Sequence, residues 1–137
     1  MTDKPTVYLL DDEPSMLKAL SRVLRAHGYH VMTFQQPADF FEHERTSGPA
    51  CLILDLAMPG LDGLAVQQRL TDEQDRIPIV FLTGHGDIPT SVKAIKAVAD
   101  DFLSKPVNGD DLVAAVKSAL TRSKIQLAED VDIAELR

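Results

Sequence analysis

Cysteine and long apolar runs are both scarce in this sequence of 137 residues. The single cysteine, Cys51, excludes an internal disulfide and a cysteine-based metal cluster, and its apolar neighbours favour a small buried side chain. No apolar run is long enough to cross a bilayer, and the amino end lacks the pattern of a secretory signal. We therefore expect a cytoplasmic protein without a membrane span.

Positively charged residues are also fewer than negatively charged ones. Lysine and arginine number 14 against 21 aspartates and glutamates, which gives a formal net charge of -7. Such an excess of negative charge argues against direct binding of this chain to nucleic acid. What remains is an ordinary globular composition, with 45% hydrophobic and 26% charged residues. The length fits one domain with one core.

Short apolar runs alternate with helical patterns along the chain. The expected strands cover residues 6–10, 30–34, 51–54, 79–82 and 102–103. The expected helices begin at Pro14, Pro37, Leu64, Pro89 and Asp110, where Asp110 is expected to be the capping residue. This α/β alternation predicts a parallel sheet covered by helices on both faces. Right-handed crossovers favour a flavodoxin-like, doubly wound (βα)5 sheet with strand order 2-1-3-4-5.

Charged and hydroxyl side chains stand where these expected strands end. Asp11 and Asp12 follow the first strand, and Asp55 ends the third. Thr83 follows the fourth strand and Lys105 the fifth. Because parallel strands place their carboxyl ends at one edge of a sheet, where ligands bind, we expect these side chains to meet there.

This combination of side chains predicts phosphoryl chemistry. Three crowded carboxylates repel one another, and a divalent cation such as Mg²⁺, which prefers oxygen ligands, relieves that repulsion. Lys105 supplies a positive charge for Asp55 or for a phosphoryl group on it, and Thr83 supplies a hydrogen bond. Phosphoryl transfer needs mainly positioning and charge neutralisation, so Asp55 is predicted to be a covalent phosphoryl acceptor.

Each of these residues also has an ordinary structural explanation. The Asp11–Asp12 pair can cap the first helix, Thr83 can be a turn residue and Lys105 can be solvated surface. Asp55 is harder to explain in this way, because a charge at the end of a buried strand needs a partner. Their joint occurrence at matching strand ends favours the functional interpretation.

Several separated stretches of the chain resemble the receiver domains of two-component response regulators. The resemblance runs from about residue 6 to residue 120, through LLDDEPSM, LILDLAMPGLDGL, IPIVFLTGHGDI and DFLSKP. It implies a CheY-like domain that accepts a phosphoryl group from a sensor histidine kinase. The stretch TGHGDIPTSVKAIKA resembles the FixJ-type subgroup of the LuxR-type transcriptional regulators, whose members usually carry a DNA-binding domain.

The resemblance implies a phosphorylation and metal site. Asp55 matches the aspartate that is phosphorylated. Asp11 and Asp12 match the acidic pair that binds Mg²⁺ together with Asp55. The backbone carbonyl of Ala57 matches a further ligand of the ion.

The resemblance also implies a switch. Thr83 and Lys105 match the residues that meet the phosphoryl group, and the Lys105–Pro106 peptide bond matches one that is cis in the family. Phe102 matches the aromatic that moves inward on activation, together with the loop 84–87 and the fourth helix. His85 is either a solvent-facing loop residue or a gate that sets the lifetime of the aspartyl phosphate.

Two positions depart from the family pattern. Val98-Ala99 stands where Gly-Ala is frequent, and Val107 stands where an aromatic is frequent. Both concern the face formed by the fourth and fifth helices. They bear on the switch packing and on the dimer geometry, while the residues of the phosphorylation chemistry all match.

After Leu120 the alternation of strands and helices ends. We expect a receiver domain over residues 1–121 and a linker or extended C-terminal helix over residues 122–137, with a frayed tail as the alternative. Leu120, Leu127, Val131 and Ala134 keep a heptad-like spacing that suits a dimerising helix. The tail resembles the linker of FixJ-type proteins, so an output domain is expected outside this sequence.

Two other functions compete with the receiver interpretation. A haloacid-dehalogenase-like phosphatase also uses an aspartate nucleophile at a strand end, but it places a second aspartate where this chain has Ala57. A degenerate receiver that acts only as an interaction module does not need the full set of strand-end residues. We therefore expect a switch and no enzyme, with a phosphorylation-dependent homodimer and DNA contact only through an output domain.

Overall fold

A five-stranded parallel sheet forms the centre of the molecule. The computed structural model describes residues 4–56, 63–84 and 101–135. The strands are β1 (Thr6–Leu10), β2 (His30–Phe34), β3 (Ala50–Asp55), β4 (Ile79–Thr83) and β5 (Asp101–Ser104). All neighbours are parallel, in the order β2-β1-β3-β4-β5. This topology confirms the predicted flavodoxin-like α/β fold.

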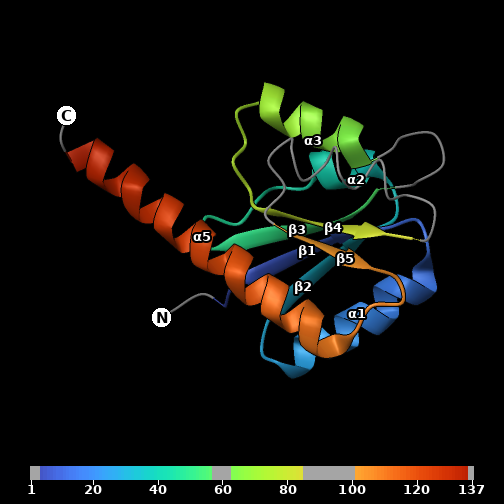
Figure 1. The fold of residues 1–137 in the computed structure, drawn as a ribbon. Helices are drawn as coiled ribbons and strands as arrows, with labels where there is room; N and C mark the ends of the chain where they lie inside the picture. The colour runs from blue at the N-terminus through green and yellow to red at the C-terminus, as the bar shows by residue number, and fades with distance from the viewer. Residues whose placement is uncertain (1–3, 57–62, 85–100, 136–137) are drawn as a thin grey trace.

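Four helices of the described residues cover the two faces of this sheet. They are α1 (Pro14–Ala26), α2 (Pro37–Glu42), α3 (Gly63–Asp72) and α5 (Gly109–Glu135). Helices α1 and α5 lie on one face, and α2 and α3 lie on the other (Figure 1). The helix expected to begin at Pro89 lies outside the described residues.

The core consists of two apolar layers, one on each face of the sheet. Successive strand residues point to opposite faces, so Val7 and Leu9 pack with α1 and α5. Tyr8 and Leu10 pack with α2 and α3. The central strands β1, β3 and β4 are buried along their whole length, which explains why their sequences are continuous apolar runs.

The start of α5 corrects one prediction. Asp110 was expected to cap this helix, but Asn108 does so. The Asn108 Oδ1 atom accepts hydrogen bonds from the backbone N–H groups of Asp110 at 2.8 Å and Asp111 at 3.3 Å. Asn108 stands just before the first helical residue, where a side-chain oxygen reaches these N–H groups. Asp110 lies within the first turn, where its charge favours the helix dipole instead.

Helix α5 continues well beyond the sheet. It contains 27 residues and runs to Glu135, so residues 122–135 are helical, in agreement with the expected extended helix and not with the frayed tail. Leu120 is buried in the core on the α1 side, and Leu127 is half-buried. These two heptad positions therefore pack on their own domain, while Val131 and Ala134 lie outside the described side chains.

None of the described helices combines the length and the apolar character that a bilayer span requires.

Candidate functional site

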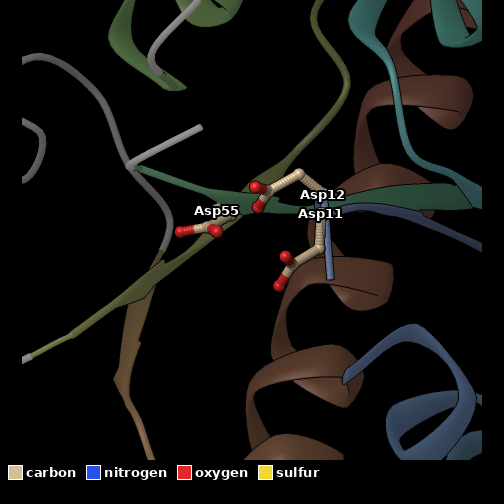
Figure 2. A group of neighbouring side chains, drawn as sticks. All are labelled: Asp11, Asp12 and Asp55. Carbon is tan, nitrogen blue, oxygen red and sulfur yellow. The ribbon is translucent and has the colours of Figure 1, made fainter. Parts of the chain in front are cut away.

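The predicted strand-end residues do meet at the carboxyl edge of the sheet. Asp11 and Asp12 follow β1, Asp55 ends β3 and Thr83 ends β4. Lys105 follows β5 and reaches back across the edge. Figure 2 shows the side chains of the three aspartates next to one another at the ends of β1 and β3. The parallel topology therefore produces the cluster that the strand ends predict.

The three aspartates are close enough to share one cation. One carboxylate oxygen of each of Asp11, Asp12 and Asp55 lies within 4.8 Å of those of the other two. Asp11 and Asp55 are buried, and Asp12 is half-buried. The Asp11 Oδ2 atom is buried and accepts no hydrogen bond from the described residues. A buried, unsatisfied carboxylate oxygen beside two further carboxylates fits a hard divalent cation such as Mg²⁺.

Asp11, one of these three aspartates, has a raised pKa. Burial is the main cause that raises the pKa of Asp11 to about 6, and the nearby charge of Asp55 acts in the same direction. The backbone N–H of Glu13 donates a hydrogen bond to Asp11 Oδ1 at 2.9 Å and opposes this rise in pKa, as does the charge of Lys105. Asp11 thus binds a proton more readily than an ordinary aspartate, and a bound cation would remove that tendency.

Lys105 is surrounded by carboxylates. Its Nζ atom lies 3.3 Å from Asp55 Oδ2, 3.5 Å from Asp11 Oδ2 and 3.5 Å from Glu13 Oε1. Burial lowers the pKa of Lys105, but Asp11, Asp55 and Glu13 together outweigh burial and raise this pKa above its ordinary value. The ammonium therefore stays charged, within hydrogen-bonding distance of Asp55.

The backbone fixes Lys105 against the end of β4. The N–H of Lys105 donates a hydrogen bond to the Thr83 carbonyl at 2.7 Å. The Lys105–Pro106 peptide bond is cis, as the resemblance implies. Thr83 is itself buried, and its hydroxyl donates to the Gly84 carbonyl at 3.3 Å. Thr83 and Lys105 are thus tied together through the backbone at the same edge.

Two residues of the site were not selected from the sequence. Glu13 contacts Lys105 across 92 positions of sequence, and no strand-end pattern points to this pair. Gly63 is the second. A Cβ atom on Gly63 would lie 2.7 Å from the Asp55 carbonyl oxygen, so only glycine lets α3 begin against the end of β3. The Asp-Gly pair at residues 62–63 was the available signal.

The remaining predicted residues divide into two groups. Phe102 lies on β5 and is 37% exposed, and Val107 packs on the core layer formed with α1 and α5. The other positions lie outside the described residues: Ala57, His85, the rest of the loop after Gly84, the helix 89–98 and Val98-Ala99.

The structure does not show Asp11 and Asp12 as capping residues of the first helix. Glu13 occupies the amino cap of α1, and no side-chain hydrogen bond caps this helix. Asp11 accepts the N–H of Glu13 instead, and its second oxygen faces Lys105. The pair therefore leaves carboxylate oxygens directed towards Asp55 and Lys105.

The chain is similar in sequence to known response regulators. A family model for the response regulator receiver domain matches residues 7–117. The chain is 41% identical over 138 residues to the response regulator protein TodT of Pseudomonas putida, across 100% of this chain and 61% of TodT. It thus spans less than two thirds of that relative.

Two solved structures are similar to the whole fold. The response regulator StyR superposes with a TM-score of 0.85 and 42% identity, across 98% of this chain and 69% of that chain. The structure of FixJ-N gives a TM-score of 0.79 and 34% identity, across 88% of this chain and 96% of that chain.

Proposed function

This chain belongs to the response regulator receiver domain family, and from that premise we propose that Asp55 accepts a phosphoryl group from a sensor histidine kinase. The single observation that carries the proposal is the position of Lys105 Nζ, 3.3 Å from a buried Asp55 carboxylate beside two further aspartates. A buried carboxylate with an ammonium on one side and a cation site on the other is positioned for nucleophilic attack on phosphorus.

In this step an Asp55 carboxylate oxygen attacks the phosphorus of a phosphohistidine. The new oxygen–phosphorus bond forms as the nitrogen–phosphorus bond breaks, and the histidine leaves with the electron pair of that bond. Lys105 neutralises charge on the phosphoryl oxygens, because its raised pKa keeps it protonated. The donor enters from solvent over the rim of the site, where Glu13 is exposed.

We propose that Mg²⁺ is the cation of the site. Asp11, Asp12 and Asp55 would hold it together with the Ala57 carbonyl that the family pattern implies. When bound, Mg²⁺ offsets the negative charge of the carboxylates and of the phosphoryl oxygens. The protein's own contribution is the rigid placement of Asp11 and Asp12 at the end of β1.

The phosphorylated form is proposed to change the face that contains β5 and α5. A phosphoryl group adds a charge of about -1.5 to -2 and several strong acceptors. Thr83 and Lys105 would turn to meet these acceptors, and Phe102, now 37% exposed, would move inward into the space behind Thr83. A near-complete population shift takes about 5.5 kcal/mol, which is within reach of a few charge-assisted hydrogen bonds.

The wider role follows from the family. We propose that the chain acts in the cytoplasm as a switch without turnover of external substrates, since the position of a second catalytic acid is Ala57. We further propose that a longer protein carries a DNA-binding output domain after residues 122–137, with residues 1–121 as the receiver. Phosphorylation would then promote a homodimer that controls transcription.

A mass-spectrometric labelling assay tests the acceptor. The wild-type chain, incubated with acetyl phosphate and Mg²⁺, should gain the mass of one phosphoryl group, and chelation of the metal should prevent the gain. Asp55→Asn should remove the labelling, because an amide oxygen cannot form the acyl phosphate. Asp39→Asn is the matched control, since this carboxylate is exposed on α2 and is not one of the clustered aspartates.

Full labelling of Asp55→Asn would overturn the acceptor assignment. Continuous release of inorganic phosphate from p-nitrophenyl phosphate would instead favour a phosphatase. A chain that binds partners but never labels would correspond to a degenerate receiver. Sizing the labelled and unlabelled protein in solution then tests the proposed dimer.

A further inference from the structure

The part of α5 beyond the sheet contacts its own domain, and two of these contacts, among the described side chains, are a hydrogen bond and a pair of ion pairs. We call residues 121–135 the α5 extension. Figure 1 shows it projecting past the strands on the side opposite to the carboxyl edge. It meets the segment before β3 and the segment before β4, so the contacts lie at the amino ends of these two strands.

The inner contact is a buried hydrogen bond. The backbone N–H of Ala50, the first residue of β3, donates to Ser123 Oγ at 3.0 Å. Both residues are buried, with relative exposures of 8% and 7%. Loss of this acceptor would leave a buried N–H without a partner, which is costly. Ser123 therefore anchors the inner end of the extension firmly.

The outer contact is different in kind. Arg76, in the segment before β4, lies 3.6 Å from Glu129 Oε2 through one nitrogen and 3.6 Å from Asp130 Oδ1 through the other. All three side chains are more than half exposed, so each ion pair is weak and is screened by salt. A cleft of about 260 Å³ separates the two anchors, with Ile77 and Leu127 among its walls.

We propose that the α5 extension is a reversible latch. Ser123 keeps its inner end docked, while Arg76 holds residues 124–135 against the domain and releases them. Leu127 is only half-buried at the wall of the cleft, so the exposed ion pairs of Arg76 add to a weak apolar contact in holding the outer part. The latch grips the amino ends of β3 and β4, whose carboxyl ends carry Asp55 and Thr83.

The latch does not depend on the proposed phosphorylation. It concerns the unphosphorylated chain, so its failure and the failure of the acceptor assignment are separate results. Where an output domain follows the extension, the latch determines whether that domain starts from a fixed or a free helix.

Hydrogen–deuterium exchange on the intact chain tests the latch. Arg76→Glu replaces attraction to Glu129 and Asp130 with repulsion, so peptides within 124–135 should exchange about fivefold faster than in wild type. Peptides within 112–120 should keep their rates and report that the domain is folded. Arg69→Glu is the matched control, because Arg69 is an equally exposed arginine in an ion pair on α3.

Two further measurements use the same readout. The triple variant R76E/E129R/D130R reverses all three charges, which recreates both attractions, and should restore slow exchange within 124–135. Raising NaCl from about 10 mM to about 1 M should loosen the wild-type extension as Arg76→Glu does, since salt screens exposed pairs. The salt series needs no substitution, so it tests the latch even if a variant folds poorly.

Equal exchange of residues 124–135 in wild type and Arg76→Glu would overturn the latch, because the helix would then support itself. Protection that disappears on dilution of the wild-type chain would also overturn it, since Arg76 would then hold the extension of a second copy. Faster exchange in Arg69→Glu to the same extent would show a general charge effect and count against the proposal.

Discussion

The charge of Asp11 is poorly accommodated by its surroundings. Its carboxylate is 1% exposed, its Oδ2 atom accepts no hydrogen bond from the described residues, and burial raises its pKa to about 6. Each unit of pKa shift corresponds to about 1.4 kcal/mol of differential stabilisation. The residue is therefore held in a charged site at a cost to stability, which is typical of a group kept for binding.

We expect Asp11→Asn to stabilise the metal-free protein. Removing the buried charge should raise the free energy of unfolding by about 2 kcal/mol near neutral pH. Urea unfolding in the presence of a chelator measures this change, with Asp39→Asn as the exposed control. The same variant should lose the stabilisation that Mg²⁺ gives to wild type. An Asp11→Asn protein that is less stable than wild type without metal would contradict this account of the site.

At the scale of elements, the junction between β3 and α3 is the tightest constraint on the site. The N–H of Gly63 donates to the Leu56 carbonyl at 2.8 Å, directly after Asp55. A Cβ at Gly63 would approach the Leu56 Cα to 2.9 Å and the Asp55 carbonyl oxygen more closely still. Because these are backbone atoms, they yield only if the end of β3 moves.

We expect Gly63→Ala to lower the free energy of unfolding by about 1–3 kcal/mol through this overpacking. Labelling of Asp55 should slow as well, since the shifted backbone carries that carboxylate. Gly109→Ala is the matched control, because its nearest new contact is Val23 Cγ1 at 3.9 Å, an ordinary packing distance. Thermal unfolding measures the stability of both variants, and the rate of phosphoryl labelling measures the effect on Asp55. Equal behaviour of the two would show that the junction tolerates a side chain.

At the scale of the whole molecule, Asp11 links stability to proton binding and to binding of the proposed metal. Its folded pKa of about 6 lies above the ordinary aspartate pKa of 3.8 that applies in the unfolded chain. A raised folded pKa means that the contribution of this group to stability is present below pH 3.8 and is lost as pH rises through about 6. The proposed Mg²⁺ would bind the deprotonated carboxylate, so it would compete with the proton below that pH.

We therefore expect Mg²⁺ to stabilise the protein more at about pH 8 than at about pH 5. The rise in Tm at a fixed Mg²⁺ concentration, measured at the two pH values, tests this linkage. Asp11→Asn should show no such difference, because it has no proton to lose at this position. A wild-type rise in Tm that is equal at both pH values would separate the raised pKa of Asp11 from metal binding.

Much of the fold and of the site could be predicted before any coordinates. The apolar runs are buried strands and the strand order is the predicted one, because period, crossover length and handedness are properties of consecutive residues. Asp11, Asp12, Asp55 and Lys105 could be brought together in the same way, since parallel strands share a carboxyl edge.

Other features depend on the folded chain alone. Glu13 reaches Lys105 across 92 positions and Ser123 reaches Ala50 across 73, and no local pattern encodes such pairs. In the sequence, Gly63 looks like an ordinary turn glycine. Only the folded structure shows that the end of β3 lies against it. A cap at Asp110 would place the first helical residue at Asp111. The helix instead begins at Gly109, so the residue before it, Asn108, is the cap.

The sequence by itself thus determined the sheet and the residues at its carboxyl edge, through periodicity and topology. The tertiary structure decided how these residues share charge, with the pKa of Asp11 raised and Lys105 placed among three carboxylates. It also decided that α5 continues beyond the sheet and returns to its own domain through Ser123 and Arg76. Burial and through-space distance set these properties, and both exist only once distant segments have packed together.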